Sequence, residues 1–369
     1  MKILFLSNLP MSSTFVVGSH QLAKQYSLMG HDVAHVSSPV SIFHAMRGKV
    51  GRAKFKASLT RPFSNTFQVY DDIPCVPFPY AYFGAIDQIN DRLVARYLKN
   101  IEFDQPDIIY IDQPAFIGAL RFINPKCVIY RPTDIYAHMH QGRNAPFEVA
   151  ALKLCDGVIT TSDAILAALG ATKPSLVVTN GVDLEKFSLQ NHSQPRSGAV
   201  YVGALDERFD FEAVRLLAEQ VPSLKIDLYG PIRTVLPTLP ANCTYKNQIN
   251  YEDIPKLLAG YEMALLPLSE HPANQGRSPM KLFEYLASGT PVLSSTLASF
   301  EGLSFKGLYT YRDVSDINSS YNKLRLSLAE LERSELIKEA AQHSWKTKAN
   351  QMLNWATALQ VKNIPGAQQ

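Results

Sequence analysis

Short apolar runs alternate with segments of helical periodicity along most of the chain, and this alternation restricts the fold more than any other feature. Strands that alternate with helices are typical of a doubly wound α/β sheet. We predict strands in the first half at residues 3–7, 32–37, 108–111, 127–131, 157–161 and 175–179. A second set is predicted at residues 199–202, 225–229, 263–266 and 291–294.

The chain is long enough for two such domains. With 369 residues, the chain is longer than a domain with one ordinary hydrophobic core. Residues 185–197 are polar, contain Pro195 and precede Gly198, so this segment is the best linker in the chain. We therefore expect domains over residues 1–190 and 198–345, with a final helical segment over residues 346–369.

Residues 274–293 read as one helix and a following strand, with a phosphate site at the helix start. Ser278 is a favoured N-cap residue, and Pro279 stands where a helix tolerates proline best, at its first position. Gly289 provides the stop. The unpaired N–H groups and the positive end of the helix dipole attract phosphate at such a start.

The side chains of this helix fit a nucleotide diphosphate. Lys281 opposes the helix dipole in the first turn, which is reasonable if a dianion binds there, and Arg277 has the fork geometry for two phosphate oxygens. Glu284 lies on the face of Lys281 and can accept hydrogen bonds from a ribose diol. Met280 can pack on the base or ribose, or be an ordinary apolar residue. The alternative for the whole helix is a surface element whose Lys281 and Glu284 only pair with each other.

This run resembles the donor-site signature of GT-B glycosyltransferases, in which a Pro-x-Lys-x-x-Glu-Tyr-x-Ala-x-Gly-x-Pro-Val element holds the sugar nucleotide. Further matches occur along the chain at Lys2-Ile-Leu-Phe-Leu-Ser7, Val128-Ile-Tyr-Arg-Pro-Thr-Asp134, Asp156-Gly-Val-Ile-Thr-Thr-Ser162, Asn180-Gly-Val-Asp183, Tyr201-Val-Gly-Ala-Leu205 and Asp227-Leu-Tyr-Gly-Pro231. Together they are most similar to the bacterial glucuronosyltransferases of xanthan assembly, within the wider group-one glycosyltransferases.

The resemblance implies a GT-B fold, which has two Rossmann-like doubly wound domains facing a cleft. The N-terminal domain then binds the acceptor, the C-terminal domain binds the nucleotide sugar, and the last helices cross back to the first domain. On the donor side, Gly203 and the pair Tyr229-Gly230 follow strands, where backbone can approach a ligand closely.

The resemblance also gives Asp134 the role of catalytic base. Asp134 follows the strand at residues 127–131, and the aspartate of the matching Tyr-Arg-x-x-Asp element takes the acceptor proton in the xanthan-type enzyme. The alternative is that Asp134 caps the next helical turn. Arg131 is expected to support Asp134 or to hold phosphate, and His20 either touches the acceptor or is simply exposed.

Two departures from the family limit the mechanism and the donor. Retaining group-one enzymes carry a Glu-x₇-Glu pair, but the first position of that pair is Gly276 here, which favours inverting chemistry and leaves retaining chemistry as the alternative. Glu284 stands where the nearest relatives have an amide, so the base and the sugar stay open, with a UDP-sugar expected. A dehydrogenase or a non-catalytic nucleotide-binding module is a distant alternative, because no Gly-x-Gly-x-x-Gly follows the first strand.

The chain has no sequence signal for a metal or a cofactor. No Asp-x-Asp lies near the donor helix, and the four cysteines are scattered without zinc-site spacing. We expect no essential divalent ion and no cofactor apart from the nucleotide-sugar co-substrate.

Residues 46–61 combine basic and apolar residues without any acidic one. Such a segment can meet an anionic membrane from the cytoplasmic side and so bring the enzyme to a lipid-linked acceptor. A solvated surface is an equal alternative, and no nucleic-acid-binding motif accompanies the charge. No run reaches the ~20 apolar residues of a membrane span, and residues 3–6 are too short for a signal-peptide core, so a cytoplasmic protein is expected.

Overall fold

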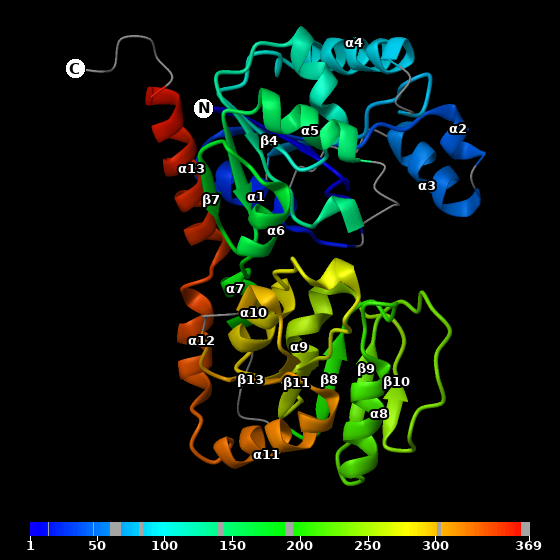
Figure 1. Cartoon of the computed structure of the whole chain (residues 1–369), viewed down its shortest axis with the longest axis vertical. Coiled ribbons are helices and arrows are strands. Elements are labelled where there is room, and N and C mark those ends of the chain that lie inside the picture. Colours follow the sequence, from blue (N-terminus) through cyan, green and yellow to red (C-terminus); the bar gives the residue numbers. More distant parts are fainter. Residues whose placement is uncertain are drawn as a thin grey trace. The chain divides into compact units, whose positions relative to one another are not determined.

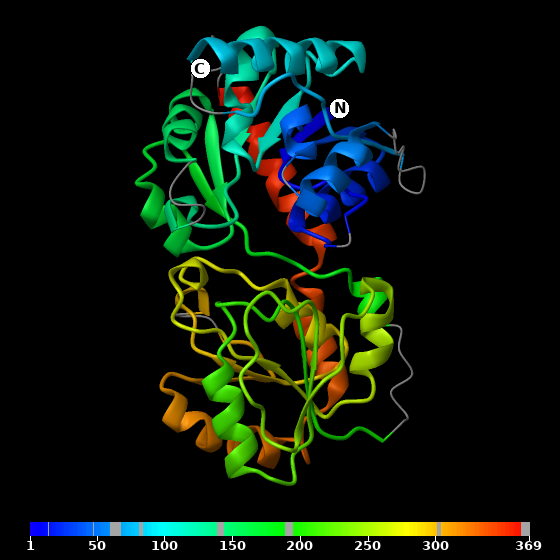
Figure 2. The same cartoon turned by 90° about the vertical axis from the view of Figure 1, so that its right-hand side faces the viewer.

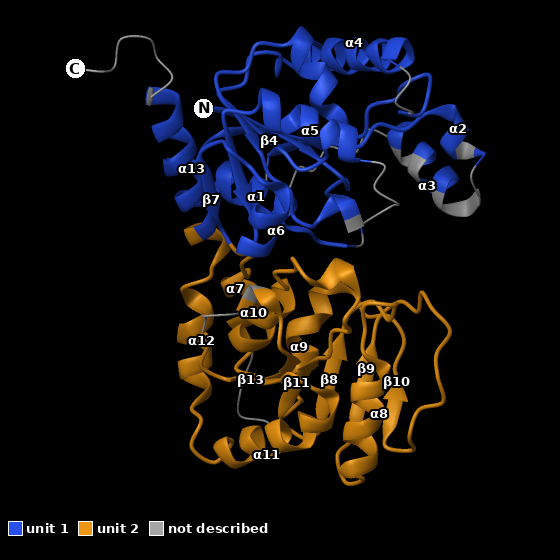
Figure 3. Cartoon of the chain, viewed as in Figure 1, with its two compact units in different colours: residues 1–178, 348–369 blue, residues 179–347 orange. Residues whose placement is uncertain are grey.

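The computed structural model describes residues 1–13, 15–46, 48–59, 68–80, 84–138, 144–188, 195–300 and 304–362. The chain forms two compact units, residues 1–178 with 348–369 and residues 179–347 (Figure 3). Each unit contains one parallel sheet with helices on its faces, as the alternation of strands and helices predicted.

The described part of unit 1 contains a seven-stranded parallel sheet in the order β3-β2-β1-β4-β5-β6-β7. Figure 1 labels two of these strands, β4 and β7. Its strands are β1 Lys2–Ser7, β2 Asp32–Ser37, β3 Val69–Asp72, β4 Ile108–Ile111, β5 Val128–Tyr130, β6 Gly157–Thr160 and β7 Ser175–Val177. Its helices are α1 Gly18–Leu28, α2 Ile42–Ala45, α3 Gly48–Leu59, α4 Gly84–Asn100, η1 Pro114–Phe122, η2 Tyr136–His138, α5 Ala145–Leu154 and α6 Asp163–Leu169.

The last helix, α13 Trp345–Lys362, joins unit 1 over most of its length. In Figure 2 it runs between the blue and the green segments of this unit. Tyr26 of α1 donates a hydrogen bond to the Ala349 carbonyl (3.2 Å), and Gln360 donates one to the Asp107 carbonyl beside β4 (2.6 Å). Residues 348–369 thus belong to unit 1.

The described part of unit 2 contains a six-stranded parallel sheet in the order β10-β9-β8-β11-β12-β13. Its strands are β8 Ala199–Val202, β9 Ile226–Tyr229, β10 Cys243–Tyr245, β11 Met263–Leu266, β12 Val292–Ser295 and β13 Leu308–Tyr311. Its helices are α7 Leu184–Ser188, α8 Phe211–Gln220, η4 Tyr251–Asp253, α9 Ile254–Leu258, η5 Pro272–Asn274, α10 Met280–Ala287, η6 Ala298–Phe300, η7 Val314–Asp316, α11 Ile317–Ser327 and α12 Arg333–Ala341.

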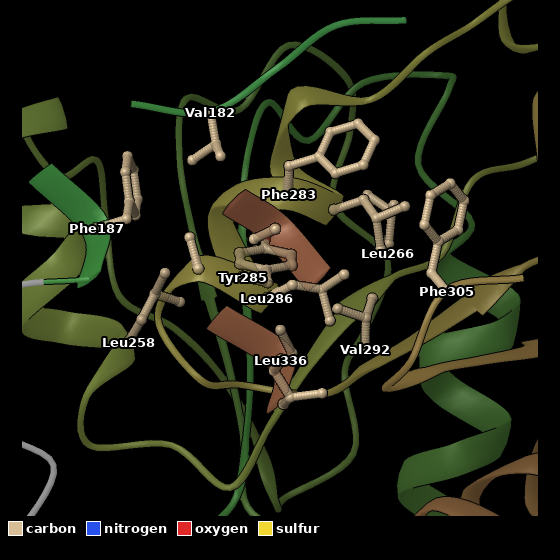
Figure 4. Packing of buried hydrophobic residues seen from close by; sticks show 14 of the residues in the cluster. Val182, Phe187, Leu258, Leu266, Phe283, Tyr285, Leu286, Val292, Phe305 and Leu336 are labelled. Atoms are coloured by element: carbon tan, nitrogen blue, oxygen red, sulfur yellow. The ribbon is translucent and has the colours of Figure 1, made fainter. Parts of the chain in front are cut away.

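Two hydrophobic clusters cover the two faces of this second sheet. One cluster joins β8, β11 and β12 to α7, α9, α10 and α12, and Figure 4 shows its side chains, with Tyr285 and Leu286 of α10 between Leu258 and Val292. The other joins the opposite face to α8 and α11. Helix α10 is therefore fixed by a packed face, which orients the polar residues at its start.

The chain passes into unit 2 before the polar linker expected at residues 185–197. Strand β7 ends at Val177, and the Val182 N–H already donates to the His343 carbonyl (3.0 Å) in unit 2. Phe187 lies in the cluster around α10. The boundary at residue 178 thus precedes the predicted limit at 190, and residues 189–194 lie outside the described residues.

Candidate functional site

Helix α10 begins one residue later than predicted. Its N-cap is Pro279, with extended backbone (φ −74°, ψ 117°), so Ser278 is not the cap and Pro279 is not the first helical residue. The Ser278 hydroxyl instead accepts a hydrogen bond from the Asn180 N–H (3.0 Å), and the Asn180 amide donates to the Ser278 carbonyl (2.6 Å). This distant contact overrides the local capping preference and attaches the approach to α10 to the start of unit 2.

The end of α10 agrees with the sequence. Gly289 adopts a positive φ of 65°, its N–H donates to the Leu286 carbonyl (2.9 Å), and the Thr290 N–H donates to the Tyr285 carbonyl (3.0 Å). These two bonds form a Schellman motif, which needs a left-handed residue at this place.

Lys281 and Glu284 contact each other, but Glu284 is not a surface residue. The Lys281 Nζ atom lies 3.8 Å from Glu284 Oε2, and the exposed fractions of the two side chains are 27% and 3%. Glu284 Oε1 accepts a hydrogen bond from the Tyr251 hydroxyl (3.0 Å). The Lys281–Glu284 pair that the surface-helix alternative expects is therefore present. Because Glu284 is buried, however, this pair is not an exposed salt bridge.

The surroundings of Lys281 disfavour the protonated form of its amine. Burial lowers its pKa, Glu284 raises it in part, and the positive charge of Arg277 lowers it further. Two cations and one carboxylate thus share this region, so a bound dianion would relieve the repulsion between Arg277 and Lys281.

Gly203 and Gly230 form a close contact between the ends of β8 and β9. A Cβ atom on Gly230 would lie 1.8 Å from the Gly203 carbonyl oxygen, and Gly230 has a φ of 142°. A Cβ on Gly203 would lie 2.4 Å from the Tyr201 hydroxyl and 3.2 Å from Cε of Lys281. Contacts within the protein therefore account for glycine at both positions without a ligand. They also place the Lys281 side chain beside Gly203. Their approach to a ligand stays a prediction.

Of the remaining residues predicted for the donor side, Arg277 lies near Lys281, whereas Tyr229 lies at the edge of the hydrophobic core. Tyr229 packs at the edge of the cluster around α10, and its hydroxyl lies 3.4 Å from that of Tyr261. The Arg277 N–H donates to the Asn274 carbonyl (3.1 Å), and its guanidinium charge acts on Tyr201 and Lys281. The half-buried Met280 opens α10. Arg277 and Lys281 thus lie near Gly203, whereas the Tyr229 side chain is part of the packed face.

In unit 1, Asp134 lies just beyond the carboxyl end of β5. Its side chain is half-buried, and Oδ2 accepts a hydrogen bond from the Thr133 hydroxyl (3.2 Å). The helical turn η2 begins two residues later at Tyr136. Burial raises the pKa of the Tyr136 hydroxyl, and the charges of Asp134 and Asp112 raise it further. Asp134 therefore occupies the strand-end position that the family resemblance gave to the base, and its catalytic role stays a prediction.

Arg131 is committed to a buried ion pair. Its Nε donates to Asp112 Oδ1 (2.8 Å) and its Nη2 donates to Asp112 Oδ2, with exposed side-chain fractions of 3% and 4%. A guanidinium that is buried and held at two points is unsuited to a phosphate ligand, and its support of Asp134 stays a prediction.

His20 is buried, so the alternative of a merely exposed histidine is wrong. Its Nε2 lies 2.9 Å from the Leu9 carbonyl, and the Val17 N–H donates to its Nδ1 (3.4 Å). Burial lowers its pKa to about 4, assisted by the neighbouring charge of His35. Both ring nitrogens therefore hold the segment between β1 and α1, and contact with an acceptor stays a prediction.

Sequence reasoning missed three residues of these sites. Asp112 directly follows β4 and could have been found by the strand-end argument that selected Asp134. Tyr136 donates to the Asp112 carbonyl (2.5 Å), and Tyr251 donates to Glu284. No local pattern marks these two tyrosines, because their partners lie far away in sequence.

Two further searches concern only the described parts of the chain. Within these parts no group of three or more His, Cys, Asp or Glu side chains could hold a metal ion, and the need for a metal is left as a prediction. No helix in the same residues has the length and apolar character required to cross a membrane.

Parts of the chain are similar in sequence to known glycosyltransferases. Residues 208–354 match the model of a family described as glycosyl transferase-like. The protein TuaH of Bacillus subtilis (strain 168), whose name assigns it to teichuronic acid biosynthesis as a glycosyltransferase, is 26% identical over 215 residues. That match covers 50% of this chain and 54% of the relative, about half of each.

Solved structures agree with the chain over nearly its full length. Sucrose-phosphate synthase of Thermosynechococcus elongatus superimposes with a TM-score of 0.70 at 14% identity and covers 97% of this chain and 99% of its own. Anabaena Alr3699/HepE, solved in complex with UDP-glucose, gives a TM-score of 0.64 at 17% identity, with 97% and 100% covered. These structures establish the GT-B fold of two Rossmann-like units, and the family model and TuaH show that parts of the chain are similar to glycosyltransferases.

Proposed function

We propose that the protein is a glycosyltransferase that moves a sugar from a nucleotide diphosphate to a saccharide acceptor in bacterial polysaccharide or glycoconjugate synthesis. The observation that carries this proposal is the group formed by Lys281, Glu284 and Gly203 at the carboxyl edge of the second sheet. Ligands of doubly wound sheets bind at this edge. The match of TuaH, named for a polysaccharide pathway, supports the acceptor class.

The donor that fits best is a UDP-sugar. Arg277 and Lys281 supply two positive charges for the diphosphate, and Glu284 supplies a carboxylate for the ribose. Anabaena Alr3699/HepE shares the fold and was solved with UDP and with UDP-glucose.

We assign the chemistry to an inverting displacement with Asp134 as the base. The acceptor hydroxyl attacks the anomeric carbon while its proton passes to the Asp134 carboxylate, and the bond from that carbon to the diphosphate oxygen breaks. Arg277 and Lys281 then stabilise the charge on the leaving nucleoside diphosphate, so the mechanism requires no divalent ion. The alternative is a retaining transferase, which has no need of Asp134 as a base.

Nucleotide release and binding test the donor site. Wild type should release free UDP from a UDP-sugar, whereas a dehydrogenase would release none. Lys281→Ala and Glu284→Ala should each raise the Kd for UDP about tenfold or more, with the exposed Lys323→Ala on α11 as the matched control. Wild-type affinity in both site variants would remove the donor-site assignment.

We also propose that the acceptor is lipid-linked and that α2 and α3 meet the anionic inner face of the cytoplasmic membrane. Ile42, Met46 and Leu59 are exposed large apolar residues of this region, and Arg52 and Lys56 are exposed beside them. Each basic residue near a charged leaflet contributes about 1 kcal/mol. Arg47, residues 60–61 and the side chains of Lys49, Val50 and Lys54 in the predicted segment 46–61 lie outside the described residues.

Vesicle co-sedimentation tests this contact. Binding to vesicles that contain phosphatidylglycerol should exceed binding to pure phosphatidylcholine and should fall as salt rises. Lys56→Glu should weaken it more than Lys338→Glu, the same charge change at an exposed position on α12. Equal binding to both lipids, or binding to neither, would show that the charges are only solvated surface.

A further inference from the structure

Glu284 is a buried carboxylate with an incomplete set of partners. Its neighbours Leu282, Phe283 and Tyr285 are all buried, and burying a carboxylate is costly unless hydrogen bonds satisfy it. Tyr251 binds Oε1 at 3.0 Å, while Lys281 Nζ lies 3.8 Å from Oε2, beyond hydrogen-bond distance. Among the described residues, no donor makes a hydrogen bond to Oε2, so one lone-pair face of this carboxylate is left for another group.

Tyr251 is itself held by residues of α7. It begins the turn η4, beyond the carboxyl end of β10, and its ring packs edge-on to Phe187 of α7 at a centroid distance of 5.8 Å. The Lys186 ammonium lies 4.3 Å from the ring centroid and also pairs with Glu252. Contacts from α7 thus fix the ring, and the ring fixes one oxygen of Glu284.

The phenol remains a hydrogen-bond donor in this position. Burial raises the pKa of Tyr251, and the negative charge of Glu284 raises it further. A neutral hydroxyl facing a carboxylate must donate its proton to the bond, so Oε1 is occupied throughout the physiological pH range.

We propose that Tyr251 is a positioning residue for ribose recognition: it holds Glu284 Oε1 so that Oε2 faces the ribose hydroxyls of a ribonucleoside diphosphate. This inference rests on the proposed donor site and adds to it the residue that sets the preference for ribose over deoxyribose. Lys281 stays close enough to Oε2 to bring the carboxylate and the diphosphate into one site. Without the Tyr251 hydroxyl, the Glu284 carboxylate can rotate toward Lys281, so that Oε2 no longer faces the ribose hydroxyls.

Binding of UDP and 2′,3′-dideoxy-UDP, measured by calorimetry, tests this role. Wild type should bind UDP about tenfold or more tightly than the dideoxy analogue, because a hydrogen bond to a charged acceptor is among the stronger ones. Tyr251→Phe should reduce this preference severalfold by weakening UDP alone, and Glu284→Gln should have the same effect. The double variant should lose no more than either single one, since both act through one contact.

A matched variant separates positioning from simple packing. Tyr309→Phe removes a hydroxyl that bonds Ser327 on the opposite face of the sheet and should leave the preference unchanged. Lys186→Met removes the cation over the Tyr251 ring but keeps the Tyr251 hydroxyl. It should therefore lower the preference for UDP over the dideoxy analogue less than Tyr251→Phe does, and it provides a second test if Tyr251→Phe folds poorly.

The outcomes separate this inference from the proposed function. A full preference for UDP in folded Tyr251→Phe would overturn the positioning role while leaving the donor site in place. Failure of wild type to bind UDP, ADP or GDP would instead remove the donor site and this inference together.

Discussion

The Arg131 guanidinium and the Asp112 carboxylate form a buried two-point ion pair at the carboxyl ends of β5 and β4. Burial raises the pKa of Asp112, and the charge of Arg131 opposes that rise. The Asp112 carboxylate holds Arg131 and its backbone carbonyl accepts a hydrogen bond from the Tyr136 hydroxyl, so Asp112 holds both ends of the short segment that contains Asp134. The position of the proposed base therefore depends on an interaction in the core of unit 1.

Asp112→Asn should destabilise the protein by about 3–5 kcal/mol, because it leaves the Arg131 guanidinium buried without its partner. The control is Lys126→Ala, which removes an ion pair with Asp107 whose lysine side chain is 69% exposed. An exposed pair contributes no more than about 1 kcal/mol. Urea unfolding at neutral pH measures both changes, and similar small losses for the two variants would contradict the structural role of Asp112.

His20 should make the protein less stable in acid. Its pKa is lowered to about 4 from an ordinary value of 6.5, so between these values the unfolded chain binds the proton and the folded chain does not. Stability should therefore fall as the pH drops from 6.5 toward 4, with a contribution from His20 of about 3 kcal/mol. Unfolding of wild type and His20→Asn at pH 7 and pH 4.5 measures the difference. An equal loss of stability in both proteins would show that His20 protonates freely in the folded state.

Gly230→Ala should damage unit 2 through the contact between β8 and β9. The new Cβ would lie 1.8 Å from the Gly203 carbonyl oxygen. Gly30→Ala is the matched control, because Gly30 also has a positive φ, of 84°, but its Cβ would meet nothing within 4 Å. The control should cost about 1 kcal/mol, and Gly230→Ala should cost about 2 kcal/mol more and weaken UDP binding. Equal effects in thermal unfolding would mean that the strand ends part easily.

The sequence was sufficient for the central strands. Strands β2, β4, β8 and β11 have the predicted bounds, because strands buried on both faces read as continuous apolar runs. The prediction missed β3, β10 and β13, each of which lies at an edge of its sheet. Strands β10 and β13 are only partly buried, and β3 is half acidic, so the sequences of all three carry a weak strand signal.

At the proposed donor site, the sequence correctly predicted only those features that depend on interactions within helix α10. The Gly289 stop and the shared face of Lys281 and Glu284 follow from helix geometry alone. The capping role of Ser278 was wrong because Asn180, remote in sequence, takes its hydroxyl. Tyr251 could not be foreseen, since only the packing of η4 against α10 brings its hydroxyl to Glu284.

Asp134 provides the sharpest test of the proposed mechanism. A base that removes the acceptor proton contributes roughly 10²–10⁴ to the rate. Asp134→Asn should therefore lower kcat about 100-fold or more while the Kd for UDP stays unchanged, because the donor residues lie in the other unit. Asp163→Asn, at an exposed position in the first turn of α6, is the control for loss of one carboxylate in unit 1.

The stereochemistry of the product gives an independent answer on the same mechanism. Attack on the face opposite the leaving diphosphate inverts the anomeric carbon, and this attack needs a base such as Asp134 beside the acceptor. NMR of the product from a donor of known anomeric configuration should therefore show inversion. A retained configuration, or near-normal turnover in Asp134→Asn, would favour the retaining alternative, in which front-face attack proceeds without that base.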